Sequence, residues 1–514
     1  MRSVLFVASE AIPFVKTGGL GEVAGSLPKE LNRQGGDVRV ILPKYGDIPG
    51  EWREKIVHLH DTHTYVGWRM QHCGLQKLEQ DGMVYYFVDN EYYFKRPGYY
   101  GYYDDAERFA FFCRAVLELL PYLDFSPEII HCHDWQTAVL PVLLKAHYSH
   151  LPEYRRLRTI TTIHNLQYQG IFDREVVGDI LGLSEDYYFT GERLEFYGAA
   201  NFLKAGIVFA DAITTVSETY AWEITTYEGG KQLDGVLRSR QADVYGILNG
   251  IDDTYYDPEH DDYIISPYSW ASIERKAENK LRLQERLNLP VDPKIPVVGI
   301  ASRLVAAKGL DLIAGVLEEL MALNMELVIL GTGEAYYEDM VRWAMSRYPD
   351  KISANIFFDE AFAHQLYAGA DIYLMPSLFE PCGISQLIAM RYGAVPIVRA
   401  TGGLKETVQP FSEETGLGNG FSFTAYNAHD MLYTIEKALS LFNDQSVWRK
   451  IVQNGMAADY SWRRSAEKYL DMYGRLLAKD EKEDIALADW SKLAAMTLSP
   501  EEMTVQASLS EVQI

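Results

Sequence analysis

The sequence predicts an α/β protein with two doubly wound, Rossmann-like domains that face each other across a central cleft. Short β-rich runs alternate with amphipathic helical stretches along most of the chain, a pattern typical of parallel sheets covered by helices. After a break, the run Pro296–Ile300 restarts this alternation, which indicates two series of elements. The length of 514 residues suits two large domains.

The first domain is predicted to span residues 1–250. Strands are expected near residues 3–8, 38–42, 84–88, 129–132, 159–163, 212–216 and 244–248. A helix is expected over Val23–Leu31, after a glycine-containing turn. The Tyr- and Phe-rich stretch 92–112 is expected to serve packing more than ligand contact.

The second domain is predicted to span residues 271–461. Strands are expected near residues 296–300, 326–330, 354–358, 372–375 and 395–398. An acidic stretch rich in Tyr and Pro, 251–270, is the predicted interdomain connection. Residues 479–514 begin with a charged run and are expected to form an extension without a catalytic role.

Composition excludes several classes of function. The net charge of −24 argues against a nucleic-acid-binding protein and against docking to an anionic membrane. The four cysteines form no C-x-x-C pair, so neither a disulfide framework nor a zinc knuckle is expected. The apolar run at the N-terminus is too short for a signal peptide, and no later stretch is long enough to span a bilayer. A cytoplasmic location is therefore expected.

A glycine loop follows the first strand. Lys16 precedes the pair Gly18 and Gly19, where the backbone can approach a ligand closely and a helix follows. The loop matches neither the Walker spacing nor the dinucleotide-binding pattern. A plain strand-to-helix turn with a solvated lysine is the alternative interpretation.

Two cations follow the first strand of the second domain. Arg303 lies just after this strand, and Lys308 directly precedes a predicted helix. Each phosphate of a diphosphate needs compensating charge where water is partly excluded, and this pair could supply it. Exposed ion pairs are the alternative.

The most informative segment follows the strand near 372–375. Glu380 lies in a turn bounded by prolines, next to Cys382, and Gly383 is expected to begin a helix. A carboxylate there could bind sugar hydroxyls while backbone amides hold phosphate. A second Gly-Gly turn, with Thr401 and Gly402, follows the next strand.

Polar residues also end strands of the first domain: Asp134, His164 and Asn249. The segment His131–Asp134 contains residue types that ligate metals, but no further His/Asp cluster supplies the other ligands, so no metal site is expected. A lone histidine is commonly structural, yet several such strand ends would converge here. No G-x-S-x-G elbow is present, which weakens a hydrolase interpretation.

Together these segments resemble the bacterial glycogen synthase and plant starch synthase family, which has the two-domain GT-B fold. The resemblance covers residues 1 to about 478 and preserves the order and approximate spacing of the motifs. The matching segments are Lys16–Leu20, His133–Trp135, His164–Leu166, Asn249–Asp252, Ser302–Leu304 with Lys308–Leu310, and Glu380–Gly383.

The resemblance implies an enzyme that transfers glucose from ADP-glucose to an α-1,4-glucan such as glycogen or starch, with retention of configuration and without a metal or other cofactor. Arg303, Lys308, Lys16 and the amides after Gly383 would neutralise the diphosphate. His164 would lie near the glucose carbon, Asp134 and Asn249 would line the sugar pocket, and Glu380 would hold glucose hydroxyls. Helix 462–478 would return to the first domain.

Some positions depart from the family's commonest residues. Phe358 occurs where a family tyrosine is thought to stack on adenine, so the ring is kept and the hydroxyl is lost. Glu22 and Glu406 replace frequent aspartates, Leu378 a frequent arginine, and Ala307 a frequent glutamine. Two alternatives stay open: a related transferase that uses UDP-glucose or a small acceptor, and a noncatalytic glucan-binding protein.

Overall fold

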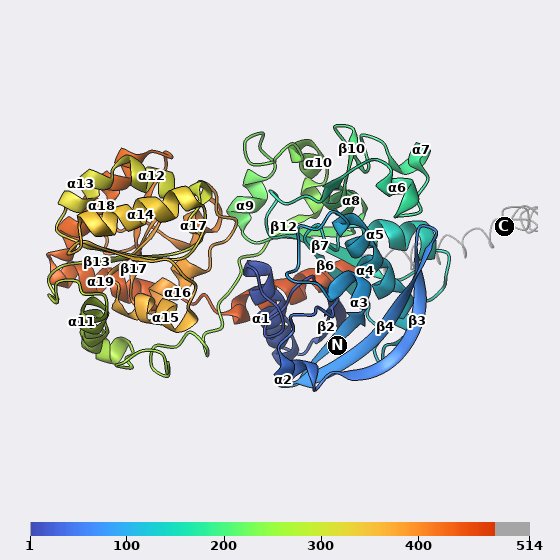
Figure 1. Ribbon diagram of the computed structural model, residues 1–514, viewed down its shortest axis with the longest axis horizontal. Helices are drawn as coiled ribbons and strands as arrows, with labels where there is room; N and C mark the ends of the chain where they lie inside the picture. Colours follow the sequence, from blue (N-terminus) through green and yellow to red (C-terminus); the bar gives the residue numbers. More distant parts are fainter. Residues whose placement is uncertain (1, 479–514) are drawn as a thin grey trace, which may run out of the picture.

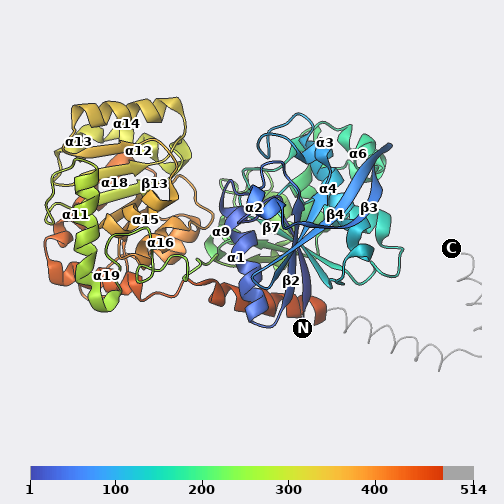
Figure 2. The ribbon, with the colours of Figure 1, turned by 60° about the horizontal axis from the view of Figure 1, so that its bottom comes forward.

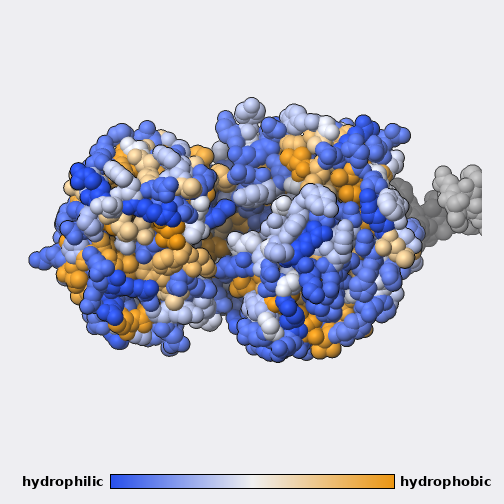
Figure 3. Space-filling model, in the orientation of Figure 1, coloured by the Kyte–Doolittle hydropathy of each residue, from blue (hydrophilic) through white to orange (hydrophobic). Residues whose placement is uncertain are grey.

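The computed structural model describes residues 2–478, which form two α/β lobes (Figure 1). The space-filling view shows a hollow between the two lobes (Figure 3). The extension expected at 479–514 lies outside the described residues. No helix among residues 2–478 has the length and apolar character needed to cross a membrane.

The N-terminal domain is built on a nine-stranded sheet with the order β12-β11-β7-β6-β1-β2-β5-β4-β3. The strands are β1 (Ser3–Val7), β2 (Asp37–Pro43), β3 (Val57–Val66), β4 (Arg69–Gln80), β5 (Met83–Asp89), β6 (Ile129–His133), β7 (Arg158–Ile163), β11 (Ala212–Thr215) and β12 (Val244–Gly246). All pairings are parallel except those of β4 with β3 and β5. The chain changes direction across the sheet between β1 and β6, where an open α/β sheet forms its ligand crevice.

The C-terminal domain has a six-stranded sheet with the order β15-β14-β13-β16-β17-β18. All its pairings are parallel, and its switch point lies between β13 and β16. The strands are β13 (Val297–Ala301), β14 (Glu326–Leu330), β15 (Ile352–Asn355), β16 (Ile372–Met375), β17 (Val395–Arg399) and β18 (Phe421–Phe423). Neighbours in β13 point to separate cores: Val298 packs in one apolar cluster and Val297 in another. Both faces are thus covered, as in a doubly wound sheet.

Helices cover these sheets (Figure 1). Those of the N-terminal domain are α1 (Gly19–Arg33), α2 (Gly50–Arg53), α3 (Glu91–Phe94), α4 (Asp105–Leu119), α5 (Leu140–Leu143), α6 (Val176–Asp179), α7 (Glu185–Tyr188), α8 (Phe202–Phe209), α9 (Glu218–Glu223) and α10 (Asp234–Ser239). Those of the C-terminal domain are α11 (Lys276–Arg286), α12 (Leu310–Gly315), α13 (Leu317–Ala322), α14 (Ala335–Arg347), α15 (Glu360–Gly369), α16 (Ser385–Arg391), α17 (Gly402–Thr407), α18 (Ala428–Phe442) and α19 (Gln445–Met456).

Some sequence predictions need correction. The strand expected at 354–358 is displaced to β15, which ends where the Asn355 amide donates to the Ile329 carbonyl. The helix expected over Val23–Leu31 is the longer α1, and the one expected at Gly383 begins at Ser385. Strands β3, β4 and β18, and a small sheet of β8 (Ile171–Phe172), β9 (Glu195–Phe196) and β10 (Ala199–Asn201), were not predicted.

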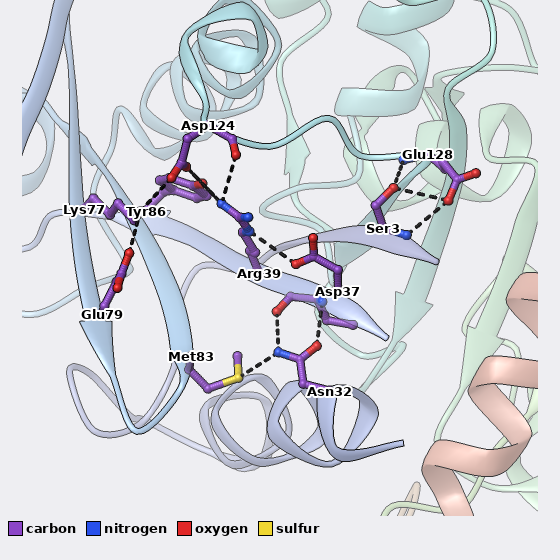
Figure 4. A network of polar contacts seen from close by, with 11 residues as sticks. Ser3, Asn32, Asp37, Arg39, Lys77, Glu79, Met83, Tyr86, Asp124 and Glu128 are labelled. Carbon is purple, nitrogen blue, oxygen red and sulfur yellow. Dashed lines mark hydrogen bonds and ion pairs between the residues drawn. The ribbon is translucent and has the colours of Figure 1, made fainter. Parts of the chain in front are cut away.

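A polar network links the amino ends of β1, β2 and β6 with the carboxyl end of the antiparallel β4, on the sheet edge opposite the ligand crevice (Figure 4). Arg39 of β2 donates to the Asp124 carboxylate at 2.9 Å, and Lys77 of β4 bonds the same carboxylate at 2.7 Å. The backbone N–H of Ser3 donates to Glu128, just before β6. The contacts at this edge of the sheet hold the strands together. The loops at the opposite edge are the ones that line the ligand crevice.

The chain crosses between the domains twice. The backbone N–H of Ile251 donates to the Tyr460 carbonyl at 2.9 Å, so the two crossing segments lie side by side. Helix 462–478 then runs along the N-terminal domain (Figure 2). It is held there by hydrogen bonds from Arg2 to the Leu470 carbonyl and from Ser465 to the Leu248 carbonyl.

Candidate active site

The N-terminal side of the site begins at the β1 end of the switch point. Glu10 is buried, and its carboxylate accepts hydrogen bonds from the backbone N–H and the hydroxyl of Thr17. Burial raises the pKa of Glu10, although these hydrogen bonds oppose the rise. Glu10 therefore holds the glycine loop in place through Thr17. The sequence motifs did not identify it as a site residue, although it lies in the loop that follows β1.

The glycine loop faces the C-terminal domain. Gly18 and Gly19 are exposed, and a side chain at Gly19 would lie 3.9 Å from the Ile384 side chain. Lys16 on the same loop forms an ion pair with Glu22 of α1. The loop and the turn before α16 are thus opposite walls of the interdomain groove.

The β6 and β7 ends bring Asp134 and His164 together. One oxygen of Asp134 accepts the backbone N–H of His164 at 2.7 Å, and Asp134 itself has a φ of 56°. Burial raises the pKa of Asp134 to about 7, against the lowering effect of the backbone N–H groups of His164 and Asn165. Burial lowers the pKa of His164 to about 3, so its imidazole is neutral near pH 7.

Asn249 is buried between the domains, and its Oδ1 has no hydrogen-bond partner among residues 2–478. Its backbone faces the thiol of Cys382, which is also buried. Burial raises the pKa of Cys382 to about 12, so the thiol stays protonated and is not a nucleophile. Cys382 thus packs beside the site residues without reacting.

The C-terminal side is centred on the β13 and β16 ends. Lys308 follows β13, Glu380 follows β16, and their side chains meet at 2.5 Å. The Ser377 hydroxyl donates to the same Glu380 oxygen at 3.1 Å. Gly309 has a φ of 81°, and a Cβ there would lie 2.3 Å from the Pro376 carbonyl oxygen. A glycine is thus required where the two loops touch.

Arg303 differs from the two lysines. Its side chain is exposed, and it forms no hydrogen bond or ion pair with another residue of the described chain. Lys16 and Lys308 are each neutralised by a carboxylate. Of these three side chains, Arg303 is therefore available to an anion at once, whereas the two lysines must first exchange partners.

The second Gly-Gly turn, in the C-terminal domain, is hydrogen-bonded to a residue of the N-terminal domain. Glu223 of α9 accepts the backbone N–H of Gly402 at 2.9 Å and the Thr401 hydroxyl at 3.2 Å. Gly402 has a φ of 45°, and a Cβ there would lie 2.0 Å from the Glu380 carbonyl oxygen. Gly383, with a φ of 73°, forms the turn before α16. No local sequence signal identified Glu223.

Phe358 is not gathered with the other candidates. It follows β15, the outer strand of the C-terminal sheet, and its side chain is 78% exposed. The neighbouring Phe357, by contrast, packs on Phe362 with ring centroids 5.8 Å apart. The described residues also contain no group of three or more His, Cys, Asp or Glu side chains arranged to hold a metal ion.

Two family models match the chain. The starch synthase catalytic domain matches residues 3–239, and glycosyl transferases group 1 matches residues 279–455. The chain is 54% identical to a glycogen synthase of Desulforamulus reducens, over 93% of this chain and 100% of that protein. It is 53% identical to a glycogen synthase of Geobacillus stearothermophilus, over 93% of this chain and 98% of that protein.

Two solved structures resemble the chain over most of its length. The catalytic domain of starch synthase IV from Arabidopsis thaliana, bound to ADP and acarbose, superposes with a TM-score of 0.87 at 33% identity, covering 93% of this chain and 99% of that one. Sucrose-phosphate synthase from Thermosynechococcus elongatus, with a TM-score of 0.60 at 16% identity over 93% and 100% of the two chains, shares the fold. The chain belongs to the glycogen synthase and starch synthase family of glycosyltransferases.

Proposed function

We propose that this glycosyltransferase lengthens an α-1,4-glucan by moving glucose from ADP-glucose to the non-reducing end, with retention of configuration and without a metal. The glycogen synthases among its relatives and the starch synthase IV domain bound to ADP and acarbose support this donor and acceptor. The observation that carries the proposal is the 2.5 Å contact of Lys308 with Glu380 at the β13–β16 switch point. Arg303, whose side chain forms no ion pair with another of residues 2–478, lies in the same loop after β13.

In the proposed reaction, the bond between glucose C1 and the diphosphate oxygen breaks, and a bond from C1 to the acceptor's 4-oxygen forms. The proton of the 4-hydroxyl goes to the departing phosphate oxygen, so the products are ADP and a glucan one residue longer. Arg303 and Lys308 stabilise the charge that develops on the leaving group. Glu380, freed from Lys308, accepts hydrogen bonds from glucose hydroxyls, and neutral His164 lies beside the sugar.

Retention is proposed to occur by attack on the same face, without a covalent intermediate. Retaining glycosidases use a carboxylate nucleophile about 5 Å from their acid. Here the carboxylates of Asp134, Glu380 and Glu10 each bond to protein groups: the His164 amide, Lys308 and Thr17. The backbone carbonyl near His164 would support the charge on the sugar. A glucosyl group trapped on any side chain would overturn this step.

The remaining site residues are proposed to hold the donor. Lys16 and the backbone of Gly18 and Gly19 would approach the diphosphate from the N-terminal wall, and Gly383 from the C-terminal wall. Thr401 and Gly402 would join them once Glu223 is displaced. Asn249 offers its unpaired Oδ1 to the sugar, and Cys382 packs beside it. Phe358, exposed after β15, would stack on the adenine only if its loop moves inward.

Donor binding is proposed to close the two domains, residues 1–250 and 271–461, and so exclude water. The motion would use the connection 251–270 and the crossing before helix 462–478, where Ile251 bonds Tyr460. Solution scattering should show compaction with ADP-glucose. Unchanged dimensions would contradict closure.

The test of the function is a primed assay with ADP-glucose and glycogen, with and without EDTA. We expect glucan growth with matching ADP release, unaffected by EDTA, and preference for ADP-glucose over UDP-glucose in direct competition. Folded His164→Ala, Lys308→Ala and Glu380→Ala variants should lose turnover. Wild-type turnover in all three would refute the site, and glycogen binding without ADP release would favour a noncatalytic role.

A cytoplasmic location is part of this proposal. All four cysteines are buried and unpaired, which suits a reducing compartment. Fractionation of the native host, with ADP-glucose-dependent activity as the marker, tests it. Activity recovered outside the cytoplasmic fraction would contradict this part.

A further inference from the structure

Three histidines form a continuous column behind the groove. His131 and His133 both lie on β6, and their rings stack at 4.4 Å with an interplanar angle of 25°. The Nδ1 atom of His133 lies 3.0 Å from Nε2 of His164. His131 and His133 are fully buried, whereas His164 is partly exposed at the groove. The column thus leads from the protein interior to the site.

The inner end of the column is fixed. His131 uses both ring nitrogens: Nδ1 pairs with the Tyr473 hydroxyl of helix 462–478 at 2.9 Å, and Nε2 pairs with the Thr162 hydroxyl at 2.6 Å. His133 rests on this ring and also contacts Phe6 at 4.8 Å. Its ring therefore has little freedom to turn.

The outer pair has an asymmetry that determines which nitrogen carries the proton. Burial lowers the pKa of both His133 and His164, so each ring is neutral and carries one N–H. The Nε2 atom of His133 is buried without a partner. If His164 donated to His133, His133 would carry its own N–H on that orphan atom, and orphaned buried donors are rarer than orphaned acceptors. His133 is therefore the donor, through Nδ1.

The hydrogen bond from His133 determines which ring nitrogen of His164 carries the proton. With Nε2 of His164 accepting from His133, its proton must sit on Nδ1. That atom forms no hydrogen bond with another residue among residues 2–478 and is not sealed from solvent, so it is available to a ligand. His164 thereby presents a donor, and not a lone pair, to whatever occupies the site.

We infer that His133 is a positioning residue that holds His164 in the Nδ1–H tautomer and aims this N–H at an oxygen of the bound sugar. This inference rests on the proposed function for the identity of the ligand, while the tautomer itself does not depend on it. His133 touches no substrate in this scheme and acts through His164 alone.

The direct test needs no variant of His133. Long-range ¹H–¹⁵N correlations of the ¹⁵N-histidine-labelled, full-length protein distinguish the tautomers, and the signal missing from a His164→Asn protein identifies His164. We expect the Nδ1–H form in the wild type. The Nε2–H form would overturn the inference, whether or not any variant folds.

Kinetics test the functional consequence. His133→Phe keeps the stacked ring and removes the donor, whereas His133→Asn can supply an amide N–H near the position of Nδ1. We expect kcat to fall about 10- to 100-fold in His133→Phe, with the KM for ADP-glucose within about twofold, and a partial return in His133→Asn. The Phe variant should also lose the single His164 tautomer.

The outcomes separate the two claims. A folded His133→Phe enzyme with wild-type kcat would overturn the positioning role. Full turnover in His164→Asn would instead refute the proposed site and leave the tautomer result standing. The exposed His63→Phe variant on β3 is the matched control, and it should leave kcat, KM and the His164 signal unchanged.

Discussion

Lys308 and Glu380 are 72 positions apart in the chain, yet their charged groups lie 2.5 Å apart at the switch point of the C-terminal sheet. Their side chains are 24% and 12% exposed, so the pair is partly shielded from water. Removing one partner leaves a charge that is poorly solvated, whereas removing both leaves none.

This pair gives a prediction that separates stability from catalysis. Lys308→Met should destabilise the C-terminal domain by about 1–3 kcal/mol, because Glu380 loses its cation. The double variant Lys308→Met/Glu380→Gln should recover most of that stability, while turnover stays about 10²- to 10³-fold below wild type. Thermal unfolding and the primed ADP-glucose assay measure the two effects. Recovery of turnover together with stability would show that the pair is only structural.

Arg303 should affect binding without affecting stability. Its side chain is exposed and unpaired within residues 2–478, so Arg303→Ala should leave the melting temperature unchanged. A charge-assisted hydrogen bond contributes about 1.5–3 kcal/mol, so the KM for ADP-glucose should rise about 10- to 100-fold. The control is Arg342→Ala on α14, whose arginine pairs with Glu338 and Asp339. Equal KM values in the two variants would remove Arg303 from the site.

Two glycines with positive φ offer a matched comparison. Gly402 has a φ of 45°, and its added Cβ would lie 2.0 Å from the Glu380 carbonyl oxygen, whereas Gly416, with a φ of 67°, has nothing within 4 Å. Gly416→Ala should cost about 1 kcal/mol of backbone strain and keep activity. Gly402→Ala should also push the Glu380 turn aside and lower kcat at least about tenfold. Equal activities would show that Glu380 tolerates displacement.

Glu223 should oppose donor binding. It occupies the Gly402 N–H and the Thr401 hydroxyl, and it adds negative charge beside the proposed diphosphate position. Glu223→Ala should therefore lower the KM for ADP-glucose several-fold, on the order of 1 kcal/mol. Glu223→Gln removes the charge and keeps an acceptor, so its KM for ADP-glucose should lie between those of the wild type and the alanine variant. A higher KM in the alanine variant would mean that the contact belongs to the donor-bound state.

Most of the parallel strands were predictable because they are short apolar runs with largely buried side chains, as β14 is throughout, whereas the three-residue β18 was missed. The hairpin strand β3 was missed because its sequence, VHLHDTHTYV, is largely polar and exposed at the sheet edge. Its stability comes from pairing with β4, which no local pattern reveals.

The residues of the candidate site also divide into those that local sequence could predict and those that depend on tertiary contacts. Lys308 and Glu380 could be selected because each follows a strand of the same parallel sheet, and strand ends of one polarity share an edge. Glu223 and His133 could not be assigned roles in this way. The first acts across the domain boundary, and the second acts through the ring of His164, so both depend on tertiary contacts.

The buried histidines should make stability depend on pH. Burial lowers the pKa of His131 to about 3, below its ordinary value of 6.5. Between these pH values the unfolded chain binds a proton that the folded chain does not, so stability falls as pH decreases, by up to about 1.4 kcal/mol per pH unit. Asp134 acts in the opposite sense, because its pKa is raised to about 7 and its protonation favours the folded state as pH falls.

Replacing one histidine isolates its contribution from the others. His131→Phe should lower stability at pH 7.5, because the Tyr473 hydroxyl loses its imidazole partner and the Thr162 hydroxyl keeps only Thr214. Its stability should fall less steeply than the wild type's below pH 6, by about 1.4 kcal/mol per pH unit, since the phenyl ring binds no proton in the unfolded state. Denaturant unfolding at pH 7.5, 6.5, 5.5 and 4.5 measures both slopes, with exposed His63→Phe as the control. Parallel slopes for His131→Phe and wild type would mean that His131 is protonated in the folded protein.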